Sequence, residues 1–199
     1  MRITILLTLL WFFTFSLTAQ IVYNNTNFDD KVATVILQKD LAIYDPLPII
    51  GLNEGDRLKL SFDILEPVNE FFNYSIVHCD RNWKLSDLQP MEYISGNTMG
   101  EITDFKFSTN TYQKYTHYNL NFPTSDMQIT KSGNYALLVY RNFDETDLVL
   151  TRRFMVVDNQ TSIESDIKTA TLPEFRFTHQ EVDFMVNYEG FDIPNPFLD

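Results

Sequence analysis

The 199-residue chain is 44% hydrophobic and 15% aromatic, with 17 Phe and 10 Tyr but only 6 Gly, 8 Pro and 1 Cys. This composition excludes a disordered, collagen-like or coiled-coil chain, and the single cysteine excludes an internal disulfide framework and a cysteine-based zinc cluster. The net charge of −12 argues against a nucleic-acid partner, because a phosphate-binding surface needs clustered Lys and Arg.

The amino terminus has the pattern of a secretory signal peptide. Arg2 precedes an uncharged run from Ile3 to Leu17, and Thr18-Ala19-Gln20 follows. Cleavage after Ala19 fits this pattern best, and a retained membrane anchor is the alternative, since the run is near the minimum length for a span. Removing residues 1–19 takes away Arg2 and no acid, so the net charge of the mature chain becomes −13.

From Lys31 onward, short runs alternate apolar and polar residues between turns, which is the period-two signal of half-buried strands. Strands are predicted over 31–41, 57–63 and 70–78. In the second of these, Leu58, Leu60 and Phe62 share one face. That strand is therefore expected to be solvated on its other side.

The segment 135–157 predicts a β-hairpin with arms at 135–140 and 148–157, both rich in strand formers, and a polar connection at 142–147. Asp144, Glu145 and Asp147 in this connection are candidate calcium ligands, because calcium takes clustered carboxylates. They lack the oxygen spacing of an EF-hand loop, so a solvated hairpin tip is the favoured interpretation.

Helical signals are weak, and the candidate is a single turn over Ser86–Gln89 that Pro90 is expected to end. Just before it, Cys79 lies in an apolar-flanked run, which favours a buried, unreactive thiol over a reactive one or an intermolecular bridge.

The stretch from His78 to Ile94 is the candidate partner-binding loop, with Trp83, Met91 and Tyr93 as its candidate contact residues. The competing interpretation is structural. In that case Trp83 folds back onto the core, while Asp80 and Asp87 cap turns.

No catalytic residues and no cofactor are expected. His78, His117 and His179 are far apart in the sequence and lack a metal-ligand spacing, so a histidine metal site across strands is the weaker alternative. The chain also lacks a Gly-x-Ser-x-Gly elbow and a glycine-rich phosphate loop.

The fold class predicted from these patterns is all-β, an antiparallel immunoglobulin-like β-sandwich over residues 30–158, preceded by a lead-in at 20–29. Asp158–Ser162 is polar and predicts a linker. Phe175–Phe177 and Val182–Val186 then restart the alternation. Residues 159–199 are therefore expected to form a linker and the truncated start of a second β domain, since two strands alone cannot bury a face.

Several separated blocks, in order, resemble the amino-terminal domain of the type IX secretion system plug protein family. They are 48–53, the candidate loop 78–94, 115–118, 129–135 and 148–158, followed by 187–188 and 193–197, which are similar to the start of that family's second domain.

This resemblance, to a family of Bacteroidetes-type Gram-negative bacteria, implies a non-enzymatic periplasmic plug. Such a protein is peripheral to the membrane, on the inner side of the outer membrane. It occludes the periplasmic opening of the translocon barrel, its partner, and dissociates for substrate export. No small-molecule substrate is implied. The alternative is a secreted glycan-binding module, because sugars stack on exposed Trp and Tyr. A hydrolase is a more distant third.

Overall fold

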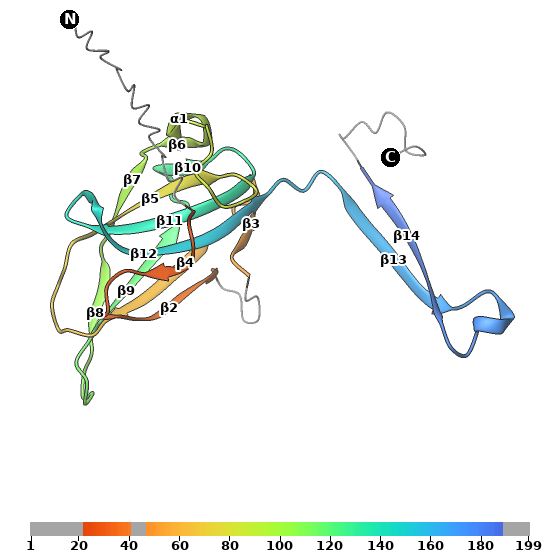
Figure 1. Ribbon diagram of the computed structural model, residues 1–199, viewed down its shortest axis with the longest axis horizontal. Coiled ribbons are helices and arrows are strands. Elements are labelled where there is room, and N and C mark those ends of the chain that lie inside the picture. Colours follow the sequence, from red (N-terminus) through yellow and green to blue (C-terminus); the bar gives the residue numbers. More distant parts are fainter. Residues whose placement is uncertain (1–21, 41–46, 189–199) are drawn as a thin grey trace, which may run out of the picture.

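The computed structural model describes residues 22–40 and 47–188, so the predicted signal peptide lies outside the described residues. The chain forms a two-layer β-sandwich, followed by a two-stranded hairpin that lies apart from it (Figure 1). The prediction of an all-β antiparallel sandwich is confirmed. Within the described ranges, no helix has the length and apolar character needed to cross a membrane.

One layer of the sandwich is a six-stranded sheet in the order β1-β12-β11-β5-β7, with β3 also pairing to β12. Its strands are β1 (Thr26–Asn27), β3 (Ile49–Gly51), β5 (Phe72–Cys79), β7 (Met99–Ile102), β11 (Gly133–Arg141) and β12 (Asp144–Val157). The β3–β12 pair is parallel and the other pairs are antiparallel.

The other layer is a four-stranded antiparallel sheet in the order β2-β4-β9-β8. Its strands are β2 (Val32–Lys39), β4 (Leu58–Ile64), β8 (Asp104–Phe107) and β9 (Thr116–Phe122). Burial alternates strictly along β4, where Leu58, Leu60 and Phe62 are all buried, so the prediction that they share one face is confirmed. β9 alternates in the same way.

Aromatic side chains fill the space between the two layers, which accounts for much of the aromatic content. Tyr118 of β9 stacks on Phe62 of β4 with ring centroids 5.2 Å apart, and Phe72 of β5 meets Tyr118 edge-on at 4.9 Å. Farther along, Phe154 stacks on Tyr135 at 5.4 Å. Such pairs are worth roughly 0.5–1.5 kcal/mol each beyond their buried area.

A second apolar cluster lies on the outer face of the six-stranded sheet. It consists of Cys79, Ala136, Leu138 and Tyr140, with Trp83 among the side chains packed on it. Cys79 is a free, buried thiol, and burial is the main cause that raises its pKa to about 11. The thiol therefore stays protonated at neutral pH, and the prediction of a buried cysteine is confirmed.

The helical turn occurs, but it starts at the residue that was expected to end it. The structure has α1 at Pro90–Tyr93, with Pro90 in the first helical turn. Proline suits that position because its fixed φ matches the helix and its missing N–H has no intrahelical partner there. The helix prediction over Ser86–Gln89 is therefore wrong. The turn leads into a small antiparallel sheet of β6 (Ile94–Gly96) and β10 (Met127–Ile129).

The hairpin of β11 and β12 is confirmed, but its connection is shorter than predicted. β12 begins at Asp144, and the two residues between the strands, Asn142 and Phe143, have φ of 50° and 61°. A two-residue turn with both φ positive matches the twist of the strands, and asparagine favours it. The pairing register shifts near Tyr140, and Asp144, Glu145 and Asp147 belong to β12 and not to the connection.

The carboxyl-terminal unit consists of β13 (Ser162–Thr169), the 3-10 turn η1 (Pro173–Phe175) and β14 (Gln180–Asn187). The strand restart at Val182–Val186 lies within β14. The prediction that strand alternation restarts at Phe175–Phe177 is wrong. Phe175 is the last residue of η1, which begins at Pro173. β13 was missed: Ile163 and Ile167 are its only large apolar residues, so the period-two signal is sparse.

Candidate interaction surfaces

The candidate loop after β5 is shaped by Asp80. Its carboxylate accepts hydrogen bonds from the backbone N–H of Asn82 at 2.7 Å and of Lys84 at 2.9 Å, and its own N–H donates to the Lys84 carbonyl at 2.8 Å. The hydrogen bond from Lys84 is the main cause that lowers the pKa of Asp80. Asp80 therefore caps this turn, as the sequence predicts.

Trp83 lies at the top of this turn with φ of 62°, in the left-handed region. Its half-buried side chain packs against the outer apolar cluster, and the Arg153 guanidinium lies over the ring, 4.5 Å from its centroid. The Arg153 side chain is itself held by the Tyr23 carbonyl and by Asn24. Since Arg153 occupies one face of the ring, the stacking surface that a sugar needs is reduced.

The other two candidate contact residues are separated by burial. Met91, in α1, is 85% exposed, whereas Tyr93 is 1% exposed and packs beside His78 and Tyr135. A groove of about 550 Å³ runs beside the loop and is lined by Leu88, Met99 and Leu138 among others. Contact of a partner with this loop stays a prediction. Of its three candidate residues, the exposed Met91 and the half-buried Trp83 are accessible to a partner.

The three histidines lie on different elements and each has a local partner. His78 Nδ1 lies 2.8 Å from the Ser86 hydroxyl, His117 Nδ1 lies 2.6 Å from Asp63 Oδ1, and His179 Nδ1 lies 2.8 Å from the Thr178 hydroxyl. In residues 22–40 and 47–188, no group of three or more His, Cys, Asp or Glu side chains is placed to hold a metal ion. The carboxylate of Asp144 instead accepts hydrogen bonds from Thr146.

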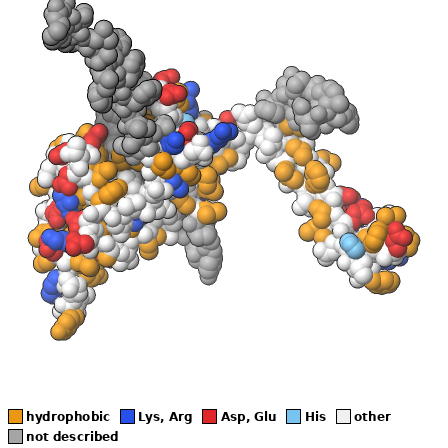
Figure 2. All heavy atoms as spheres, viewed as in Figure 1, with side chains coloured by type: hydrophobic (Ala, Val, Ile, Leu, Met, Phe, Trp, Pro, Cys, Tyr) orange, Lys and Arg blue, Asp and Glu red, His pale blue; other side chains and the backbone are white. Residues whose placement is uncertain are grey.

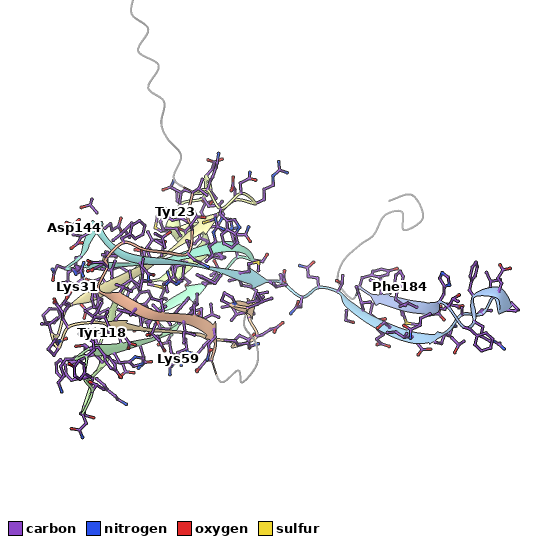
Figure 3. The ribbon with its side chains drawn as sticks, turned by 60° about the horizontal axis from the view of Figure 1, so that its bottom comes forward. Tyr23, Lys31, Lys59, Tyr118, Asp144 and Phe184 are labelled. Carbon is purple, nitrogen blue, oxygen red and sulfur yellow. The ribbon has the colours of Figure 1, made fainter. Side chains whose placement is uncertain are left out.

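A second surface, not foreseen from the sequence, lies at the end of the sandwich away from the hairpin. We call it the aromatic pole, and it consists of the segments 28–31, 65–71, 107–115 and 141–147, which comprise loops and the strand ends next to them. Figure 3 shows Lys31 and Asp144 at this end, and Figure 2 shows apolar and charged side chains gathered there. Its exposed large apolar side chains are Phe28, Leu65, Val68, Phe71, Phe107, Tyr112 and Phe143.

Arg141 ties three of these loops together. Its guanidinium forms ion pairs with Asp29, with Glu70 at 2.6 Å and with Asp147 at 3.4 Å. Burial acts to lower the pKa of Arg141, but the hydrogen bonds to Glu70 and Asp29 outweigh it and raise that pKa. Burial likewise acts to raise the pKa of Asp29, and hydrogen bonds from Lys31 and Arg141 hold it below the usual value.

Backbone and side-chain hydrogen bonds also hold the loops of the aromatic pole together. The Thr116 hydroxyl donates to the carbonyls of Glu66 and Val68 at 2.9 Å each, and the Gln113 side chain donates to the Leu65 carbonyl at 3.1 Å. The Phe143 N–H donates to the buried Asn73 side chain at 2.9 Å. The exposed aromatic rings are thus presented on loops that are fixed to one another.

The family model described as "Type 9 secretion system plug protein 1st domain" matches residues 32–158. A crystal structure of a hypothetical protein from Parabacteroides merdae is similar over 90% of this chain, with 29% identity and a TM-score of 0.73. The chain covers 45% of that protein, and so spans less than half of its length.

The alkylpurine DNA glycosylase AlkC of Pseudomonas fluorescens, bound to DNA containing an abasic site analog, is weakly similar. It shares 12% identity, the match covers 63% of this chain and 30% of that protein, and the TM-score is 0.35. No curated protein matches the chain.

Proposed function

Because the chain belongs to the type 9 secretion system plug protein family, we propose that it is a non-enzymatic periplasmic plug of the outer-membrane translocon. In this role it occludes the periplasmic opening of the translocon barrel and dissociates when a substrate is exported. The observation that carries the proposal is the family match over residues 32–158, which includes every strand of the sandwich except β1.

The physical character of the sandwich supports this role. A plug must be a folded body that resists deformation, and the described core is closely packed with aromatic rings, with Tyr118, Tyr135 and Phe154 almost fully buried. A plug also needs no reacting group. His78, His117 and Asp144 form hydrogen bonds to neighbouring side chains or backbone, and these contacts stabilise local structure.

Deletion of the gene tests the proposal through outer-membrane permeability. Loss of the plug is expected to raise uptake of a hydrophilic antibiotic too large for ordinary porins, and the wild-type gene supplied in trans is expected to restore the barrier. The protein is also expected to co-purify with the translocon from native outer membranes. Unchanged permeability together with absence of the translocon from the purified material would contradict the proposal.

A further inference from the structure

The aromatic pole contains a pocket of about 330 Å³ between Phe71, Phe105 and Phe143. Phe71 is 74% exposed and Phe143 is 59% exposed. Neither ring fills the core. The adjacent Phe72 does so from the first position of β5, where it packs edge-on against Phe62 at 5.5 Å. Phe71 and Phe143 are therefore available for contact without a change in the core.

Hydrogen bonds and an ion pair fix the residues that line the pocket. Asn73 is 2% exposed, lines the pocket and accepts the hydrogen bond from the Phe143 N–H, while the Asn142 N–H donates to the Phe71 carbonyl at 3.2 Å. Glu70, also in the lining, is fixed by Arg141. A preformed apolar pocket on fixed loops loses little conformational entropy on binding.

The net charge around this pocket is negative. Its lining includes the carboxylates of Glu70 and Glu101 but neither Lys nor Arg. Over the four segments of the aromatic pole there are seven carboxylates and three cations. Within the described part of the chain, no cation forms an ion pair with Glu101, Asp30 or Asp144. Arg141 compensates the carboxylate of Glu70, but Glu101 keeps its negative charge and the four segments of the pole remain net negative.

From this arrangement we infer that the pocket between Phe71, Phe105 and Phe143 is a protein-docking site. Its occupant is an apolar anchor side chain of a partner protein, flanked on that partner by Lys or Arg. Aromatic anchors in pockets supply most of the binding energy at interfaces, and opposite charges at the rim set orientation and association rate.

The same charges disfavour other occupants. An anionic membrane surface and a nucleic acid both present phosphates, which the carboxylate rim repels. The inference goes beyond the proposed function, because it depends only on the described pocket. The permeability experiment and the binding experiment below therefore succeed or fail independently.

The test is an NMR titration of the ¹⁵N-labelled mature protein with two capped peptides, Lys-Leu-Trp-Leu-Lys and Glu-Leu-Trp-Leu-Glu. The basic peptide is expected to shift the amide signals of Asn73, Thr103 and Phe143 in a saturable manner. The acidic peptide is expected to bind at least about fivefold more weakly, because the rim repels it. Equal affinities, or shifts confined to residues outside the pocket, would overturn the inference.

Two kinds of variant locate the binding. Replacing both exposed rings, Phe71→Ser with Phe143→Ser, is expected to weaken binding of the basic peptide at least about tenfold. Glu101→Lys keeps the apolar lining and is expected to reduce the preference for the basic peptide, so the inference is testable even if the double variant unfolds. Met91→Ser is the matched control at an exposed apolar residue of the other surface. An effect of Met91→Ser as large as that of the double variant would contradict docking at this pocket.

Discussion

Arg141 connects residues that are far apart in the sequence, since Asp29, Glu70 and Asp147 converge on it from three loops. All three of its nitrogens pair with carboxylates, and the side chain is only 20% exposed. Arg141 stabilises the fold because its loss would leave partly buried carboxylates unpaired. Asp29 and Glu70 would remain partly buried without the cation that compensates their desolvation.

Arg141→Met is expected to lower the free energy of unfolding at pH 7 by about 2 kcal/mol, less than for a fully buried pair because the site is partly exposed. The pKa of Asp29 is lower in the folded state than its ordinary value of 3.8. Its contribution is therefore present above that value and is lost as the pH falls through the lowered pKa. The difference between variant and wild type should shrink below pH 3.8 in urea unfolding measured across pH.

Lys31→Met is the matched control for this prediction. Lys31 pairs with Glu66 at the same end of the sandwich, but both side chains are more than 40% exposed, so little change in stability is expected. Equal effects of the two substitutions at all pH values would contradict the prediction, because the ion pairs of Arg141 would then contribute no more than an exposed pair.

At the scale of elements, the β13–β14 hairpin has one apolar and one charged face. Directly paired residues of antiparallel strands share a face, which places Ile163, Ile167, Val182, Phe184 and Val186 together. The opposite face carries Lys168, paired with Asp183 and Glu181. The apolar face is uncovered, as Figure 2 shows along the hairpin. We propose that the hairpin is the opening of a second β unit, whose further strands would cover this face.

An uncovered apolar face of this kind promotes self-association. The mature chain, residues 20–199, is therefore expected to form concentration-dependent oligomers, which Phe184→Ser reduces, as measured by sedimentation velocity. Met185→Ser is the matched control, because Met185 is 63% exposed against 70% for Phe184 and lies on the charged face. If the two variants reduce association equally, the apolar face is not responsible.

At the scale of the whole molecule, the sandwich and the hairpin are separate bodies, and the sandwich closes at the end of β12. Met155 and Val156 of β12 pair with Ile49 and Ile50 of β3, and Val157 pairs with Gly51. The N–H of Leu52 donates to the Val157 carbonyl at 2.7 Å. Figure 1 shows the chain leaving the sandwich after this point. The stability of the sandwich should therefore not depend on the hairpin.

A chain that ends after Gln160 is expected to keep its free energy of unfolding within about 0.5 kcal/mol of the longer chain, because no core contact is removed. A chain that ends after Met155 also loses the buried Val156 and the pairing of Val156 and Val157 with β3, and is expected to lose about 2 kcal/mol or more. Urea unfolding followed by near-ultraviolet circular dichroism of the aromatic core measures both. A large loss of unfolding free energy in the chain that ends after Gln160 would show that the hairpin stabilises the sandwich.

Local pattern was sufficient for several structural features. The alternation in β4, the hairpin arms of β11 and β12, the turn at Asp80 and the burial of Cys79 depend on residues close together in sequence. The helical turn was predicted before Pro90 and not after it, because a proline can either follow a helical turn or begin one. In the structure Pro90 begins the turn, and the chain enters β6 at Ile94.

The candidate site was predicted only in part. Trp83, Met91 and Tyr93 are neighbours in sequence, yet their exposure differs because Tyr93 faces the core and Met91 faces solvent. Phe71 and Phe143 were not singled out, since a phenylalanine in a strand-rich chain most often fills a core. The doublet Phe71-Phe72 was the available signal, because adjacent residues of a strand point to opposite faces.

The sequence by itself determined the all-β class, the family and the alternation that separates core from surface, because period-two burial is a local property of a strand. The 17 Phe and 10 Tyr indicated ample core material but not which rings stay outside. Only the tertiary structure decided that, since the aromatic pole is assembled from four separate segments, in which paired residues such as Asp29 and Arg141 are 112 positions apart. Which side chains meet there depends on how the two sheets pack, and no short pattern encodes that arrangement.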